Sequence, residues 1–431
     1  MGSPYDYVMA PGELLDDKLV QLDDDSGTTI IRGGTVLDGT GGRHEDATVV
    51  IRGGLIEALH LAGKAPPPPD DARLIDATGA TVMPGIMDAH IHMQGNASPD
   101  PLRGHLEPSD DVKFIRAAFE MYQVLASGVT TVRALGHGPA EHTYALRESA
   151  RLGLIHGPRM LISGWALSQT RGHGDLRVMP YDWVEHERPR AAFCDGELEC
   201  RKMVRRNFGE GADVIKVYSS DNRTGRPDFT VDELSAIADE AHRRGKRVAT
   251  HAKTYEGVRN ALEAGIDTIE HGTPEVHEDL LETMLAQETH LIPTMATVHR
   301  IAAEGADWGA PPAAIERAKR ELEGRQGMVR RAHEMGVKVG TGSDAGARSG
   351  FGLLAAREVA LLVDCGFSPM DAVSAATHVA AGALGIQADV GSISADKAAD
   401  ILVIDGDLLA DVGRLQDRTN IRVIVQRHHH E

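Results

Sequence analysis

Aromatic and basic side chains are both scarce in this chain of 431 residues. Aromatic residues make up 4% of it, which weakens any interpretation based on stacking nucleic-acid bases against protein rings. The 45 lysines and arginines are outnumbered by 64 aspartates and glutamates, so the formal net charge is −19. A surface of this charge repels nucleic acids and anionic membranes. We therefore expect neither as a partner, although one or two local cations would be enough to bind a small anionic substrate.

Cysteine is also rare, and the three cysteines form no Cys-x-x-Cys pair: Cys194, Cys200 and Cys365. An odd number of unpaired cysteines predicts a reduced compartment. The start of the chain lacks the basic and apolar segments of a secretory signal, and no later apolar run is long enough to span a membrane. We expect a cytoplasmic protein, unless a leader has been removed. The histidines at 428–430 resemble a truncated affinity tag and are not counted as metal ligands.

Short strand-like segments separated by glycine pairs occupy residues 29–82. Similar short strand-like segments occur near the end of the chain, at 390–393, 399–405 and 421–425. We therefore predict a small β-sandwich domain built from both termini, residues 1–82 and 390–431. A second domain, residues 83–389, would be inserted between these two parts.

The inserted part alternates between apolar strand-like runs and helical patterns. We count eight runs, at residues 82–92, 129–135, 159–163, 213–218, 247–252, 268–271, 290–294 and 337–344. Helical patterns lie between most of them, at 111–126, 230–244, 255–264, 276–287, 312–335 and 355–364. This alternation predicts an α/β fold, a (β/α)8 TIM barrel with its chemistry at the carboxyl ends of the strands. The alternative, a doubly wound sheet, lacks the Gly-x-Gly-x-x-Gly motif expected after its first strand.

Residues that can bind metal ions stand at the ends of the predicted barrel strands. They are His90, His92, Lys216, His251, His271 and Asp344. A single strand-end histidine is more often structural, but a barrel would bring all six residues to one centre. We predict that His90, His92 and Asp344 bind one divalent ion. The two remaining histidines would bind a second, and zinc suits this set of ligands best, although manganese or cobalt would also fit.

Lys216 lies inside the apolar run Asp213-Val-Ile-Lys-Val-Tyr218, where an unpaired ammonium is costly. Burial beside metal ions would lower the pKa of this amine, and the neutral amine can add carbon dioxide to form a carbamate. A carbamate offers two oxygens that can bridge two ions. We therefore predict that Lys216 is N-carboxylated and that the centre holds two metals.

Four stretches resemble signatures of the amidohydrolase superfamily, in its binuclear branch with a carboxylated lysine. They are Met83-Pro-Gly-Ile-Met-Asp-Ala-His-Ile-His, Glu270-His-Gly-Thr, Gly342-Ser-Asp-Ala-Gly and Ala398-Ala-Asp-Ile-Leu-Val-Ile. The texture is similar to the imidazolonepropionase-like and prolidase-like group, which includes ochratoxin-hydrolysing amidohydrolases and dipeptidases acting on Xaa-Pro or Xaa-Arg. The resemblance implies a metal-dependent amide-bond hydrolase, and also a homo-oligomer, because relatives commonly assemble.

The predicted reaction is hydrolysis of an N-acyl amino acid or dipeptide that carries a free carboxylate, with ochratoxin A as one such substrate. A metal-bridging hydroxide would attack the amide carbonyl, while the ions stabilise the oxyanion. Asp344 would take the proton and pass it to the leaving nitrogen. Lys216 would contribute to catalysis as the bridging carbamate.

Substrate contacts are predicted at five positions. Tyr218 lies two residues after Lys216 on the same strand face, so it points into the barrel mouth. The resemblance implies that it binds the substrate carboxylate or the oxyanion. Arg171 and His173 lie in the long glycine-containing loop after the third strand. In prolidase-like relatives, a similar Gly-His-Gly element approaches the carboxylate of the substrate. His137 and His299, just past the second and seventh strands, are further candidates.

Two other functions remain as alternatives. A deaminase or cyclic-amide hydrolase of the same superfamily is the first. Mononuclear deaminases of this superfamily lack the lysine and carry a glutamate soon after the histidine of strand five, whereas here His251 is followed by Ala-Lys-Thr. A non-enzymatic barrel scaffold is the second, but such proteins lose metal ligands, and this chain has all six.

Overall fold

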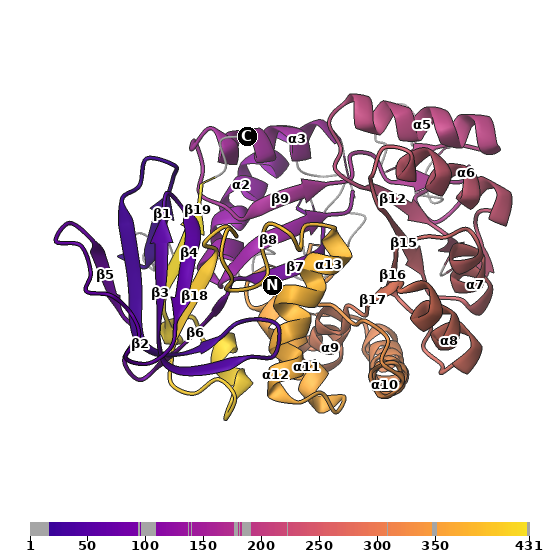
Figure 1. The fold of residues 1–431 in the computed structure, drawn as a ribbon. Helices are drawn as coiled ribbons and strands as arrows, with labels where there is room; N and C mark the ends of the chain where they lie inside the picture. Colours follow the sequence, from indigo (N-terminus) through magenta and orange to yellow (C-terminus); the bar gives the residue numbers. More distant parts are fainter. Residues whose placement is uncertain are drawn as a thin grey trace.

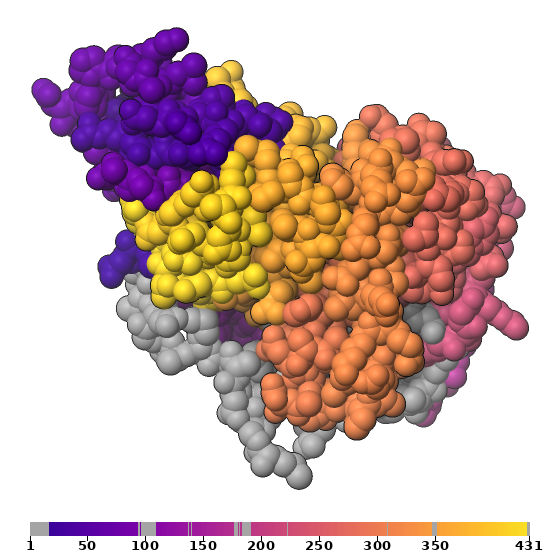
Figure 2. Space-filling view, turned by 90° about the horizontal axis from the view of Figure 1, so that it is seen from below, coloured from indigo at the N-terminus to yellow at the C-terminus, as the bar shows by residue number. Residues whose placement is uncertain are grey.

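The structure is a computed structural model, and it describes residues 17–93, 95, 109–136, 138, 140–175, 180, 182, 191–221, 223–307, 309–346 and 351–428. Strands from both ends of the chain form one eight-stranded sheet (Figure 1). Its strands are β1 (Leu19–Leu22), β2 (Thr28–Leu37), β3 (Arg43–Arg52), β4 (Leu55–His60), β5 (Arg73–Asp76), β6 (Ala80–Pro84), β18 (Ile401–Asp405) and β19 (Ile421–Arg427). They follow the order β1-β19-β18-β6-β2-β3-β4, and β5 pairs with β2. This sheet has a hydrophobic cluster of its own, and Figure 2 shows the C-terminal segment lying against the N-terminal one.

The strand that we predicted over residues 82–92 is wrong as a single element. The structure divides it into β6, in the terminal sheet, and β7 (Ile86–Ile91), the first strand of the barrel. Gly85 separates the two strands, and a Cβ atom at this position would lie 2.0 Å from Thr130 Oγ1. The chain can therefore change sheets here only because the residue has no side chain.

The barrel strands are parallel and lie in two connected sheets. The first contains β7, β8 (Val129–Ala134) and β9 (Arg159–Ile162), and the second contains β10 (Leu167–Ser168), β11 (Ala192–Phe193), β12 (Ile215–Tyr218), β15 (Val248–Ala252), β16 (Thr268–His271) and β17 (His290–Ile292). The predicted third strand, 159–163, is confirmed as β9, which pairs with β8. The short strand β10 follows it and pairs with β12, so the two sheets meet between β9 and β10. The expected TIM-barrel fold is confirmed by this order and by structural relatives described below.

The predicted eighth strand is not a regular strand. Isolated bridges join Val339 to Leu291 of β17 and Ala345 to Ile91 of β7. The backbone N–H of Asp344 also donates to the carbonyl of His90, at 2.8 Å. These bonds connect the last sheet strand to the first and place Asp344 beside the histidines.

Helices alternate with the strands, as the periodicity predicted. The main ones are α2 (Asp110–Ala126), α3 (Ala140–Arg151), α5 (Glu197–Gly209), α6 (Val231–His242), α7 (Tyr255–Glu263), α8 (Glu278–Gln287), α9 (Met295–Glu304), α10 (Pro312–Met335), α11 (Leu354–Asp364) and α12 (Pro369–Ser374). Sequence signals fix several ends: Thr230 and Glu233 form a capping box at α6, and Pro312 and Gly336 bound α10. Helix α3 was missed because it buries few side chains. In the described part of the chain, no helix is both long and apolar enough to cross a membrane.

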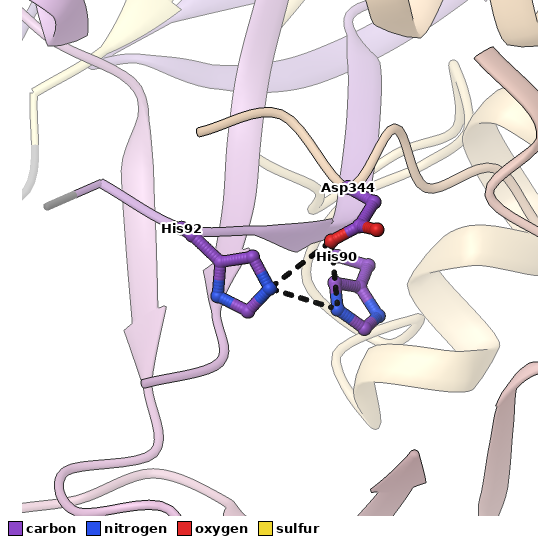
Figure 3. A group of neighbouring side chains, drawn as sticks. All are labelled: His90, His92 and Asp344. Atoms are coloured by element: carbon purple, nitrogen blue, oxygen red, sulfur yellow. Dashed lines mark hydrogen bonds and ion pairs between the residues drawn. The ribbon is translucent and has the colours of Figure 1, made fainter. Parts of the chain in front are cut away.

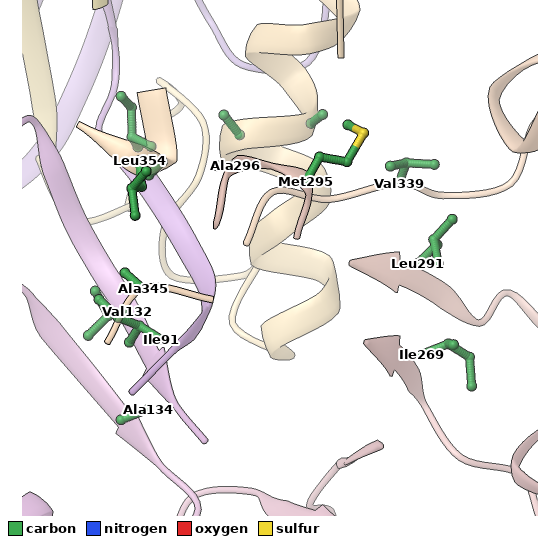
Figure 4. Packing of buried hydrophobic residues seen from close by; sticks show 14 of the residues in the cluster. Ile91, Val132, Ala134, Ile269, Leu291, Met295, Ala296, Val339, Ala345 and Leu354 are labelled. Atoms are coloured by element: carbon green, nitrogen blue, oxygen red, sulfur yellow. The ribbon is translucent and has the colours of Figure 1, made fainter. Parts of the chain in front are cut away.

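The barrel core is made of aliphatic side chains from neighbouring strands and the helices that cover them. Ile91 of β7 and Val132 of β8 pack on one side, and Leu291 of β17 lies near Met295 of α9 on the other (Figure 4). Burying each such side chain contributes roughly 1.5–3 kcal/mol. This rigid layer holds the carboxyl ends of the strands, which carry the polar residues described next.

Candidate metal centre

His90, His92 and Asp344 form a compact group of ligand atoms at the end of β7 (Figure 3). Nε2 of His90 lies 3.3 Å from Nε2 of His92. Oδ1 of Asp344 lies 3.7 Å from the first of these nitrogens and 3.1 Å from the second. Within the described part of the chain, these three side chains bring their ligand atoms within 4.8 Å of one another. Two imidazole nitrogens and a carboxylate oxygen form a donor set that suits zinc.

Hydrogen bonds at the other ring nitrogens fix the tautomer of both histidines. Nδ1 of His90 lies 2.6 Å from Oε2 of Glu270, and Nδ1 of His92 lies 3.3 Å from the carbonyl oxygen of Gly136. An ionised carboxylate and a carbonyl only accept hydrogen bonds, so each Nδ1 carries the proton. The lone pair of each Nε2 is therefore directed into the group and is available to an ion.

Glu270 is held ionised by a buried arginine. Arg133, only 1% exposed, donates to Oε1 of Glu270 at 2.6 Å, and the hydroxyl of Thr268 donates to the same oxygen at 2.6 Å. Burial alone would raise the pKa of Glu270, but the charge of Arg133 and the hydrogen bond from His90 outweigh it and lower the pKa to about 2. Glu270 therefore stays negatively charged at neutral pH. We did not predict this role, and the only signal was a charged residue directly before a predicted ligand.

Asp344 is placed by contacts from the strand that carries the histidines. Its backbone has φ 55°, a conformation that costs a non-glycine residue energy. Asp88 accepts hydrogen bonds from the backbone N–H of Ser343, at 2.9 Å, and from its hydroxyl, which fixes the preceding residue. Burial raises the pKa of Asp344, but the contact with His92 and the nearby positive charge, which includes Lys253, lower it further, well below its ordinary value.

Lys216 points its amine into the interior of the barrel without a hydrogen-bond partner among the described residues. The side chain is 1% exposed. Burial lowers the pKa of Lys216 to about 8, although Glu270 and Asp344 partly oppose this change. A carbamate requires a buried amine that is easily neutralised and that no hydrogen bond from the described residues engages, so Lys216 fits the predicted bridging ligand.

His251 and His271 lie together on the adjoining strands. Their ring centroids are 4.5 Å apart, and the ring of His271 is 4.9 Å from that of His90. Burial, followed by neighbouring positive charges, lowers the pKa of both rings well below the usual histidine value. Both are therefore neutral at pH 7, as metal ligands must be. His271 has φ 75°, and its Nδ1 lies 2.7 Å from the hydroxyl of Thr294.

Two of the five predicted substrate contacts lie next to these histidines. The ring centroid of His173 is 4.1 Å from that of His251 and 4.9 Å from that of Tyr218. Tyr218 is 6% exposed and faces the same group. These positions agree with a pocket at the barrel mouth, but the contacts with substrate stay predictions.

Of the other three predicted contacts, two bond to residues other than the predicted ligands, and one is not described. Arg171 donates to the buried carboxylate of Asp175 at 3.2 Å. Nδ1 of His299 accepts from Arg357 at 3.2 Å, so the ring is turned to α11 rather than to a predicted ligand. His137 lies outside the described residues.

A cavity of about 1220 Å³ lies at the opposite ends of the strands. Asp213 and Arg247, which precede β12 and β15, line it. Its arginines include Arg147, which is paired with Asp213 at 2.6 Å. Barrel chemistry is expected at the other end, so we do not assign the active site to this cavity.

Comparisons with known proteins identify relatives of the whole chain. The chain is 27% identical to an ochratoxinase from Aspergillus niger over 421 residues. The alignment covers 91% of this chain and 84% of the ochratoxinase. The crystal structure of a Xaa-Pro dipeptidase with methionine bound in its active site superposes with a TM-score of 0.82, at 28% identity and covering 93% and 98% of the two chains. A prolidase complexed with N-methylphosphonate-L-proline superposes with a TM-score of 0.80, at 30% identity and covering 93% and 100%. Residues 81–426 match the model of the amidohydrolase family. The chain therefore belongs to the amidohydrolase family, as the four stretches of sequence indicated.

Proposed function

We propose that this hydrolase uses two divalent metal ions, with zinc the best fit, to cleave the amide bond of N-acyl amino acids or dipeptides that carry a free carboxylate. We include ochratoxin A among its substrates. The observation that carries the proposal is the convergence of His90 Nε2, His92 Nε2 and Asp344 Oδ1 near a buried lysine amine. Two similar proteins, an ochratoxinase and a Xaa-Pro dipeptidase, support the substrate class by their names.

The histidines would bind the metals through ring nitrogens that carry no proton. His90 and His92 offer Nε2 because their Nδ1 protons are engaged, and His251 and His271 are neutral. Lys216 as a carbamate would connect the two ions. When bound, the ions would lower the pKa of a water molecule and polarise the amide carbonyl.

Asp344 would move the proton in this reaction. Its pKa is lowered, so it is ionised at neutral pH and can accept a proton. Its carboxylate is 3.1 Å from His92, within the group of ligand atoms. A second transfer from Asp344 to the leaving nitrogen would complete the cleavage. Tyr218 and His173, which pack together beside His251, would bind the substrate carboxylate or the developing oxyanion.

A hydrolysis screen with metal analysis tests the proposal. Purified protein would be offered dipeptides, N-acyl amino acids and ochratoxin A, each together with its methyl ester, while zinc, manganese and cobalt per chain are measured. We expect two ions per chain and faster hydrolysis of the free acids. Protein that holds two ions and hydrolyses none of these amides would contradict the proposal. Release of ammonia from a heterocyclic amine would favour the deaminase instead.

A further inference from the structure

Lys253 is a cation at the barrel mouth that the proposed reaction has not yet used. It lies directly after the carboxyl end of β15 (Val248–Ala252), two residues after His251. Its backbone N–H donates to the hydroxyl of Ser220 at 2.9 Å, which fixes its position beside the end of β12. Its side chain is 22% exposed, so the ammonium is neither fully buried nor free in solvent.

The ammonium of Lys253 shares one carboxylate with a second cation. Nζ donates to Oε1 of Glu321 at 2.7 Å, and the guanidinium of Arg325 donates to the same oxygen. Two positive groups and one negative group leave a net charge of +1 in this cluster. Arg325 is 1% exposed and also donates to the carbonyls of Pro293 and Thr294, so its hydrogen-bonding capacity is directed inward. Of the two cations, Lys253 is therefore the one that a ligand can reach, with a side chain 22% exposed against 2% for Arg325.

Two arginines in the described part of the chain near the predicted pocket, Arg171 and Arg223, bond to the loop around His173. Arg171 donates to Asp175, and its side chain is 46% exposed. Arg223 donates to the carboxylate of Asp221 and to the carbonyls of Gly172 and Asp175, at 3.0, 2.6 and 2.8 Å. These contacts hold the loop around His173 in place rather than offering a free guanidinium.

We propose that Lys253 binds the substrate carboxylate and so sets the preference for substrates with a free acid. This inference rests on the proposed function, because it names a specificity residue of the same site. An ammonium with donors left over after one ion pair can form a charge-assisted hydrogen bond to a second carboxylate. Tyr218 and His173 lie beside His251, and Lys253 follows His251 by two residues. Tyr218 and His173 would therefore contact the same end of the substrate.

The test compares Lys253→Met and Lys253→Arg with the wild type. The methionine variant leaves Glu321 paired with Arg325, so the fold should be retained. For N-benzoyl-L-phenylalanine we expect KM to rise about 10- to 100-fold with a smaller change in kcat, the range of one charge-assisted hydrogen bond. KM for the methyl ester should stay the same, and Lys253→Arg should keep most of the affinity for the acid. Lys246→Met, an exposed change before the same strand, is the matched control.

Calorimetry separates this inference from the proposed function. Binding of L-phenylalanine and of L-phenylalaninamide to the metal-loaded protein does not require turnover. Weaker binding of the acid alone in Lys253→Met supports carboxylate recognition even if no substrate is hydrolysed. Equal losses for the acid and the amide, or no loss for either, would overturn it.

Discussion

Replacing Lys216 by methionine should make the metal-free protein more stable while lowering the number of metal ions that it binds. Burial lowers the pKa of this lysine from 10.5 to about 8. At about 1.4 kcal/mol for each pH unit, this difference corresponds to a cost of about 3 kcal/mol for the folded state at pH 7. Methionine has a similar length and no charge, so it removes that cost. Its sulfur cannot form a carbamate, so the proposed bridging ligand would be lost.

The sign of the pH dependence follows from the same values. Between pH 8 and 10.5 the unfolded chain keeps the lysine proton while the folded chain has released it. Stability rises with pH wherever the unfolded state binds more protons. The destabilisation by Lys216 is therefore complete below about pH 8 and disappears as the pH approaches 10.5. The metal-free wild type should gain stability from this group between those values, and Lys216→Met should not.

Urea unfolding of metal-free protein at pH 7 and pH 10, in buffers free of carbon dioxide, measures this difference. Comparing wild type with variant cancels other titrating groups, and Lys246→Met controls for the loss of an exposed lysine. Zinc content after reconstitution with bicarbonate should fall from two ions per chain in the wild type to fewer in Lys216→Met. A variant that is no more stable at pH 7, or that keeps two ions, would refute the reasoning.

Three further substitutions test single parts of the site. Glu270→Gln should lower the affinity for the ion proposed at His90 by about 10- to 100-fold in a chelator competition, because the ring loses its ionised acceptor. Glu275→Gln, an exposed change on the same segment, should leave this affinity unchanged. Asp344→Asn should keep the circular dichroism spectrum but lower kcat by at least about 100-fold, and a near-normal kcat would exclude Asp344 as the proton carrier. Tyr218→Phe should raise KM for the free acid by about 10-fold, and an unchanged KM would remove its hydroxyl from substrate binding.

The sequence predicted the barrel and the place of the ligands because both depend on local patterns. Strand and helix periodicity indicated the order of elements, and strand ends of a barrel share one face. The same reasoning could not predict which residues support the ligands. Glu270 reaches His90 across 180 positions, and Asp88 reaches Ser343 across 255. Such contacts depend on strand register and side-chain rotamers, which no local pattern contains.

The broken elements show a second reason. The predicted strand over 82–92 looked continuous because both halves are apolar, yet the chain changes sheets at Gly85. The segment at 337–344 has the composition of a strand but pairs only through isolated bridges. Its departure from regular geometry turns Asp344 towards the histidines. Here the prediction failed in regularity rather than in position, and the irregular backbone is what places the carboxylate.

Three of the seven non-glycine residues with positive φ in the described part of the chain lie at the candidate metal centre. His271, Thr294 and Asp344 have φ values of 75°, 51° and 55°, and such conformations cost about 1–3 kcal/mol each in non-glycine residues. Lys216 adds a buried ammonium without a hydrogen-bond partner among the described residues. The hydrophobic layers beneath the strand ends offset these costs, and bound ions would offset them further, because a ligand that binds only the folded state stabilises it. Metal occupancy should therefore govern how long this protein stays folded as well as how fast it turns over.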